Sequence, residues 1–257
     1  MVFSAAVALD IDYPYRYSMI IIRYIKTKEN NMKTLKTLLA AFAILGFFGL
    51  PDAHALGLGL YGSTGGGTAD WSPDTNAGFR KSSEHLSYGF ALDTAPASDN
   101  LFNYNLNIGY DQFSNKNTKR SNAWENTDLD GFLMSHNFGF GGLITASTRV
   151  WFGPELRIEW LEGAPSNFSD YKIRLIGFGI GPVLGLNFNV SERLTGVFKV
   201  GYQNMQYHGY GRGRFSHATD AASISSNDYD YDIREKLVYV TFEFLARTSG
   251  SKQPGPE

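Results

Sequence analysis

The chain has 257 residues, of which 43% are hydrophobic and 15% aromatic, and its formal net charge is −2. It contains no cysteine, which excludes a disulfide framework and thiolate metal sites. The near-neutral charge offers no basic surface of the kind that binds nucleic acid, and we expect neither a metal ion nor a cofactor.

Residues 32–55, MKTLKTLLAAFAILGFFGLPDAHA, have the layout of a cleaved secretory signal peptide. Two lysines precede an apolar run at 38–50, and the small residues Ala53 and Ala55 fit a cleavage site. The run is shorter than the roughly 20 residues that a transmembrane helix needs, so we expect export through the Sec pathway. Residues 1–31 precede this complete signal, and we interpret them as a spurious N-terminal extension.

Beyond the signal, the chain alternates between apolar and polar side chains, with the period of a β-strand. In LFNYNLNIGYDQF, Phe102, Leu106 and Ile108 share one parity, and three asparagines share the other. The pattern predicts eight strands, at residues 56–63, 85–93, 101–113, 131–141, 148–162, 171–189, 194–203 and 235–244. Their connections alternate between long polar loops and short turns. The predicted long loops are 62–84, 114–130, 162–170 and 204–230, and the predicted turns are 94–100, 141–147 and 190–193.

Two kinds of barrel suit such strands. A soluble ligand-binding barrel places apolar side chains inside, whereas a membrane barrel places them on the lipid and its polar side chains in the lumen. The even strand count and the alternation of long and short connections favour the membrane barrel. Outward aromatic residues near the extracellular strand ends, among them Tyr110, Trp160 and Tyr202, agree with an aromatic girdle. The predicted fold is therefore all-β, an eight-stranded antiparallel up-and-down transmembrane β-barrel over residues 56–244, with a disordered tail at 245–257.

The last predicted strand, KLVYVTFEF, directs Val238, Val240, Phe242 and Phe244 outward. With this strand, the signal peptide and the strand layout, the chain resembles the eight-stranded outer-membrane barrel proteins of Gram-negative bacteria, the class of OmpA-, OmpX- and OmpW-like barrels. The resemblance implies an outer-membrane location and recognition of the final strand by the barrel assembly machinery. It also implies contact with outer-membrane lipid and lipopolysaccharide.

The segment ELRIE points Glu155, Arg157 and Glu159 into the predicted lumen. Lys199 and Glu243 share the inward parity of their own strands. Because an eight-stranded barrel is just wide enough for side chains, we predict that Arg157 and Lys199 bridge to these carboxylates and close the lumen to ions. The alternative is that the same residues line a pore. Further inward carboxylates are predicted at Asp93, Asp111 and Glu235.

Gly153–Pro154 and Gly181–Pro182 repeat a pair on neighbouring predicted strands. Proline cannot donate a hydrogen bond to the ladder, so each pair predicts a bulge or bend.

Some outer-membrane barrels modify lipid A, and the deacylases among them use a histidine with a serine two residues later. Here Ser135 and His136 are adjacent, which places them on opposite faces of a strand, so we expect no catalytic residues. The segment HGYGRGRF carries Arg212 and Arg214 in a predicted extracellular loop. Arginine binds phosphates well, and we assign these two residues to contact with lipopolysaccharide or another surface ligand.

The sequence thus favours a non-enzymatic outer-membrane barrel with a structural or surface-binding role in the envelope, exerted through its extracellular loops. A narrow channel or transporter for small solutes is the main alternative. A lipid A-modifying enzyme is a third.

Overall fold

The computed structural model describes residues 56–73, 78–96, 100–117, 126–165, 170–215 and 225–247. The predicted N-terminal extension, the signal peptide and the tail after residue 247 lie outside the described residues. In the described ranges, no helix has the length and apolar character to cross a bilayer.

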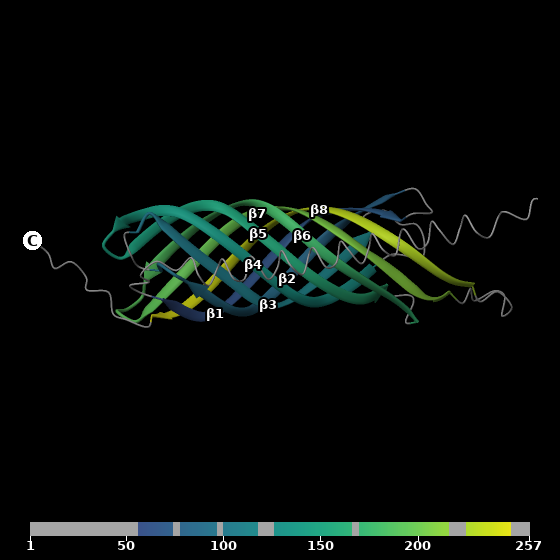
Figure 1. The fold of residues 1–257 in the computed structure, drawn as a ribbon, viewed down its shortest axis with the longest axis horizontal. Helices are drawn as coiled ribbons and strands as arrows, with labels where there is room; N and C mark the ends of the chain where they lie inside the picture. The colour runs from purple at the N-terminus through teal and green to yellow at the C-terminus, as the bar shows by residue number, and fades with distance from the viewer. Residues whose placement is uncertain are drawn as a thin grey trace, which may run out of the picture. The chain divides into compact units, whose positions relative to one another are not determined.

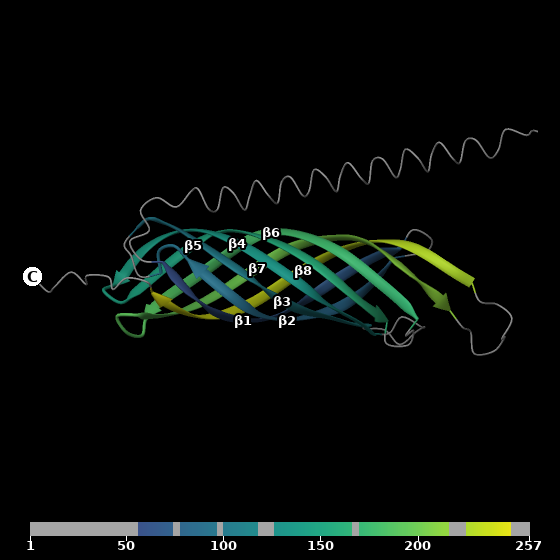
Figure 2. The same cartoon turned by 60° about the horizontal axis from the view of Figure 1, so that its bottom comes forward.

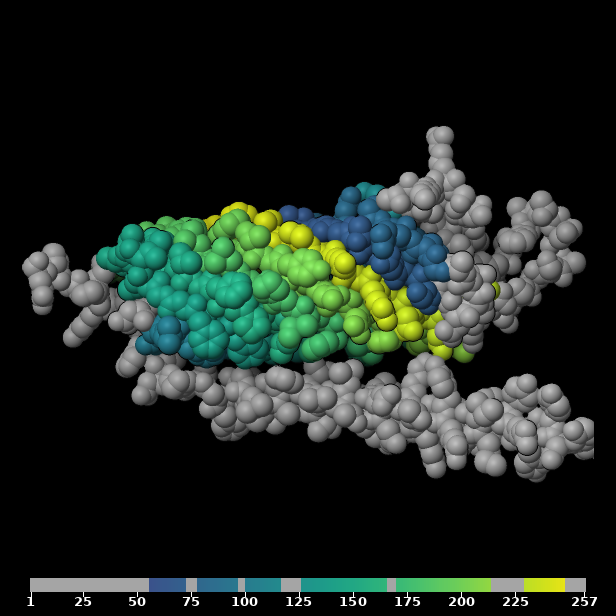
Figure 3. Space-filling view, turned by 90° about the horizontal axis from the view of Figure 1, so that it is seen from above, coloured from purple at the N-terminus to yellow at the C-terminus, as the bar shows by residue number. Residues whose placement is uncertain are grey.

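Eight antiparallel strands form a closed barrel in which each strand pairs with its neighbour in the chain, and β1 pairs with β8 (Figures 1 and 2). Their bounds are β1 Gly57–Pro73, β2 Phe79–Asp93, β3 Phe102–Asn117, β4 Asn126–Thr145, β5 Thr148–Pro165, β6 Tyr171–Asn189, β7 Leu194–Phe215 and β8 Ser225–Arg247. The surface in Figure 3 shows β8, in yellow, running beside β1, in dark blue. The predicted eight-stranded up-and-down barrel is confirmed.

The strands extend much further than the sequence pattern predicted. Most of the segments predicted as long loops continue the ladder, and β7 pairs with β8 as far as Phe215 opposite Ser225. The glycine-rich stretch after Gly62 pairs with β2 on one side and with β8 on the other. The predicted bounds of these loops are therefore wrong, since backbone pairing continues into the polar segments, and residues 74–77, 118–125, 166–169 and 216–224 lie outside the described part. At the other end β8 runs to Arg247, into the segment predicted as tail.

In one zone of the barrel, large apolar side chains cover the outside. Phe90 is 72% exposed, Trp160 61% and Phe244 60%. Such exposure is unfavourable in water but suits acyl chains. Aromatic residues border this zone in a row across adjacent strands, where ladder partners follow one another as Tyr88, Tyr110, Phe132 and Trp160. The outside of this zone has the lipid-facing surface predicted from the alternation.

Towards the β1–β2, β3–β4, β5–β6 and β7–β8 connections, the polarity of the two faces is reversed. The outer face there carries exposed ion pairs, such as Arg80 with Asp70 and Lys116 with Glu84. The inner face is buried and mostly apolar, and Lys81, Asn115 and Thr127 are polar exceptions on it. Its cluster comprises Ala69, Trp71, Phe113, Leu129, Leu161, Tyr171, Ile173, Leu175, Met205, Tyr207, Tyr231 and Ile233. We call this cluster the apolar plug. This part of the barrel follows the rule of a soluble barrel, with its apolar side chains inside, and it projects beyond the apolar outer band.

The two Gly-Pro pairs meet on adjacent strands, with Pro154 directly opposite Pro182. Pairing with the outer neighbours is interrupted at these positions and then resumes in the same register. Of the predicted bulge or bend, the bulge is therefore absent, because two missing donors interrupt the ladder without inserting a residue. The register of the β4–β5 pairing does shift elsewhere, between Leu143 and Thr145 next to the turn that joins these strands.

The change of polarity along β7 predicts different tolerance for charge at two outward positions of one strand. Arg in place of Val200, in the apolar band, should destabilise the barrel by about 2–4 kcal/mol in a bilayer. Arg in place of Gln206, on the same face but in the charged zone, should change stability little. Urea unfolding in lipid vesicles measures both, and an equal loss at the two positions would contradict the assigned boundary.

Candidate functional site

The lumen is the candidate site, and its end near the β2–β3 turn is closed by hydrogen bonds to that turn. Arg149 donates from Nη1 to the carbonyl oxygen of Ala95 at 2.8 Å and from Nη2 to that of Asn100 at 2.7 Å. Asn187 donates to the carbonyl of Pro96 and accepts from the indole of Trp151 at 2.8 Å. These buried groups tie the turn to β5 and β6 across the base of the barrel.

Above this base, Lys199 of β7 is the centre of a buried polar group. Its Nζ forms an ion pair with Glu243 of β8 and lies 2.9 Å from Oδ1 of Asn105 on β3. Asn105 also donates to Glu243 at 2.8 Å and accepts from Asn137 at 3.1 Å. Side chains from four strands therefore meet across the lumen, and the buried ammonium group has both a counter-charge and an amide acceptor.

Arg157 of β5 organises a second group closer to the apolar plug. Its Nε forms an ion pair with Glu159 of the same strand, and its Nη2 lies 3.6 Å from Oδ1 of Asp111 on β3. The Tyr207 hydroxyl lies 2.7 Å from Oε2 of the same Glu159. The predicted lumen residues thus come together, but Arg157 reaches β3 and Lys199 reaches Glu243, so the two cations serve separate groups.

His85 is a buried lumen residue that the sequence reasoning missed. Its Nδ1 lies 2.8 Å from Oδ2 of Asp111, and its Nε2 lies 3.0 Å from Oε1 of Glu235. All three side chains are buried. Because Asp111 also faces Arg157, the histidine joins β2 and β8 to the arginine group. The inward parity of His85 with Ser87 was the available signal, because His85 is the first residue of the strand predicted at 85–93, but no role was assigned to it.

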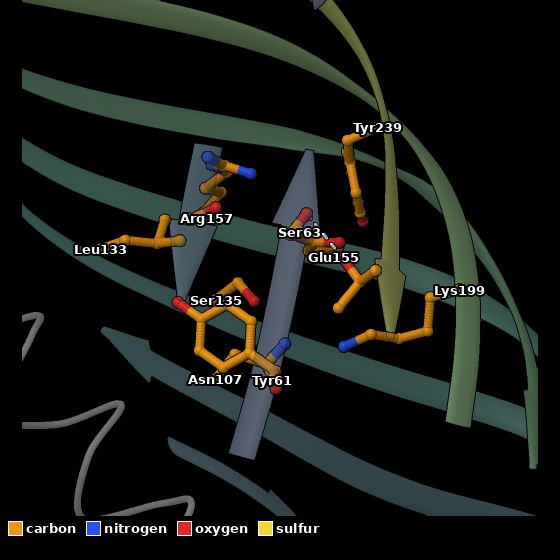
Figure 4. Close-up of a pocket in the computed structure, with 11 residues that line it drawn as sticks. Tyr61, Ser63, Asn107, Leu133, Ser135, Glu155, Arg157, Lys199 and Tyr239 are labelled. Carbon is orange, nitrogen blue, oxygen red and sulfur yellow. Dashed lines mark hydrogen bonds between the residues drawn. The ribbon is translucent and has the colours of Figure 1, made fainter. Parts of the chain in front are cut away.

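Between the two groups is a small cavity, shown in Figure 4, to which Tyr61, Ser63, Ser135, Glu155 and others contribute. Its volume is about 10 Å³, close to the minimum for one water molecule. Oε2 of Glu155 is buried with no hydrogen-bond donor among the described residues. The predicted bridge to Glu155 is therefore not formed directly, and this carboxylate faces the cavity instead.

Glycines on the inner face provide the room that large side chains need. A Cβ atom added to Gly185 would collide with the indole ring of Trp151, and one added to Gly177 would collide with the ring of Tyr207. Both rings are fully buried. The interior is therefore packed by pairing a glycine on one strand with an aromatic residue on the next.

On the outer face of the projecting zone, cations gather on β6 and β7. Lys172 and Arg174 share one carboxylate, Glu162, at 3.8 and 2.8 Å. The hydrogen bond from Arg174 lowers the pKa of Glu162, a group outside the apolar band. Arg212 is opposite Lys172 in the ladder, is exposed and lies in β7 rather than in a loop. Arg214 also belongs to β7, and its side chain lies outside the described part.

Ser135 and His136, the residues weighed for catalysis, lie on opposite faces of β4. Ser135 lines the internal cavity, whereas Nδ1 of His136 is 2.6 Å from the hydroxyl of Tyr104. The two side chains do not come together.

Removing one member of the buried arginine group should be far more harmful than removing an exposed one. Arg157→Met would leave Glu159 buried without its cation and Asp111 with His85 alone, and it should destabilise the barrel by about 3–5 kcal/mol. The additional change Glu159→Gln should restore part of this loss. Arg174→Met, which breaks the exposed pair with Glu162, is the matched control and should have little effect. Equal urea-unfolding midpoints for Arg157→Met and Arg174→Met would show that the lumen is open to water.

No protein-family model matches the chain, and no curated protein sequence does. Among solved structures, the chain is similar to the outer membrane protein OprG from Pseudomonas aeruginosa, with a TM-score of 0.50, 13% identity and coverage of 76% of this chain and 95% of that chain. It is also similar to Neisserial surface protein A (TM-score 0.28, 15% identity, 70% of this chain and 96% of that chain). The attachment invasion locus protein Ail of Yersinia pestis matches with a TM-score of 0.27 and 12% identity, over 74% of this chain and 98% of that chain. At 13% identity the likeness to OprG concerns the fold alone, which is that of an antiparallel outer-membrane-type β-barrel, and the eight-stranded ring with its apolar outer band agrees with that fold.

Proposed function

We propose that the chain is a non-enzymatic outer-membrane barrel that acts through its projecting extracellular zone, as a structural or surface-binding component of the envelope. The observation that supports this most strongly is the filled lumen. The base, the two polar groups and the apolar plug follow one another through the described barrel. The cavity between them has room for about one water molecule.

The projecting zone supports the surface-binding part of the proposal. Strands that continue beyond the lipid band hold the outward side chains rigidly, which favours recognition over a mobile loop. Lys172, Arg174 and Arg212 offer guanidinium and ammonium groups next to the lipid boundary. Lipopolysaccharide carries phosphates at that height, and we propose that these residues bind them. The final strand, with its outward Val240, Phe242 and Phe244, is the segment that we propose the barrel assembly machinery recognises.

Planar-bilayer recording separates this proposal from the channel alternative. The purified protein should show no unitary conductance, because ions would have to displace buried ion pairs and the apolar plug. A stable, reproducible unitary conductance of the folded protein would contradict the closed lumen and support a channel for small solutes.

Charge removal on β6 and β7 tests the surface role. Lys172→Gln with Arg212→Gln should reduce the lipopolysaccharide that remains bound to the purified protein, and added salt should weaken binding to the unchanged protein in the same direction. Arg80→Gln with Lys116→Gln removes two cations elsewhere on the projecting zone and is the matched control. The lipopolysaccharide contact is wrong if both double variants retain as much as the unchanged protein.

A further inference from the structure

The layer around His85 holds more carboxyl groups than cations. In the middle of the lumen, five carboxylates are buried, from Asp111, Glu155, Glu159, Glu235 and Glu243. Two permanent cations, Arg157 and Lys199, lie among them in the described barrel, and His85 can supply a third charge. Buried carboxylates are costly without counter-charges, so this layer favours uptake of a proton or of a further cation.

Two sets of contacts show which carboxyl groups lack a close positive charge. Oδ1 of Asp111 is fully buried and accepts no hydrogen bond within the described residues, and its cation, Arg157, is 3.6 Å away. One hydroxyl, that of Tyr207, faces carboxylate oxygens of both Glu159 and Glu235, at 2.7 and 3.0 Å. A single hydroxyl proton is thus shared between two carboxylates from different strands.

The geometry around His85 matches a metal site in its donor atoms and in the support behind them. His85, Asp111 and Glu159 each place one ligand atom within 4.8 Å of the others. A tetrahedral metal with bonds of about 2.1 Å holds such atoms about 3.4 Å apart, so the widest pair must close by up to about 1.4 Å. Nε2 of His85 faces Glu235, as in the carboxylate–histidine pairs that orient metal ligands, which leaves Nδ1 to face the metal.

We propose that His85, Asp111 and Glu159 bind a divalent transition metal of the zinc type inside the lumen, with Glu235 as the positioning residue for His85. Binding exchanges the proton on Nδ1 for the metal, and the proton leaves to solvent. The carboxylate oxygens retain a second lone pair for Arg157 and Tyr207. The mixture of one imidazole and two carboxylates selects zinc, cobalt or iron over calcium and magnesium, which prefer oxygen ligands alone.

The test uses Co²⁺ as a spectroscopic probe. The full chain is unfolded in urea, refolded in detergent with Co²⁺ and freed of excess metal. We expect one Co²⁺ per folded chain, with visible absorption typical of nitrogen and oxygen ligands, and we expect Zn²⁺ but not Mg²⁺ to displace it. A folded protein that retains no Co²⁺ would overturn the proposal.

Variants locate the site. His85→Gln should abolish retention, and Glu235→Gln, which keeps all three ligands, should weaken it about 10–100-fold. Glu243→Gln removes a buried carboxylate from the Lys199 group and is the matched control, with retention unchanged. Undiminished retention in folded Glu235→Gln, or equal loss in Glu243→Gln, would overturn the assignment even if His85→Gln fails to fold. A negative result would not affect the surface role, which conductance and lipopolysaccharide retention test separately.

Discussion

The fixed, narrow interior of a closed eight-stranded ladder is the constraint on which the rest of this structure depends. Pairing of β1 with β8 removes both free edges, and it also fixes the space inside. Every inward side chain must then fit against those of the opposite wall. The pairing of Gly185 with Trp151 and of Gly177 with Tyr207 is the steric consequence. The electrostatic consequence is that buried charges meet partners from other strands, as Lys199 meets Glu243 and His85 meets both Asp111 and Glu235.

The same ladder passes through two environments, and the side chains change faces accordingly. In the lipid zone the outer face is apolar and the inner face polar. In the projecting zone exposed ion pairs cover the outside and the apolar plug fills the inside. The backbone needs no change at this boundary, because hydrogen bonding in a closed barrel is satisfied in lipid and in water alike. The choice between a membrane barrel and a soluble barrel is thus made separately in each zone.

The alternation of side chains was sufficient to predict the lipid zone, since Phe90, Trp160 and Phe244 face outward there. It was insufficient in the projecting zone for a physical reason. Segments rich in glycine, asparagine and lysine have a composition typical of loops. The large apolar side chains that point inward from them are few and widely spaced. Trp71, for example, stands among polar neighbours in a segment predicted as loop, and only pairing with the next strand shows that it points inward.

The candidate site was predictable in its members but less so in its contacts. Parity placed Arg157, Glu159, Lys199 and Glu243 inside. Contacts across the lumen depend on the stagger of strands that are distant in the sequence, and alternation within one strand carries no information about it. For this reason Glu155 was expected in an ion pair but faces the cavity, and the link from His85 to Glu235 was not foreseen.

In this barrel, one continuous strand crosses from a lipid-facing to a water-facing surface while the barrel interior remains closed. This crossing can be tested along β7. Spin labels at the outward positions from 198 to 212 in a bilayer would report collisions with oxygen, which concentrates in lipid, and with a water-soluble relaxation agent. We expect access to oxygen at Phe198, Val200 and Tyr202, and access to the water-soluble agent from Gln206 towards Arg212. Access to oxygen at every labelled position would contradict a water-facing outer end of β7. Alternation between the two agents from one labelled position to the next would contradict a single boundary.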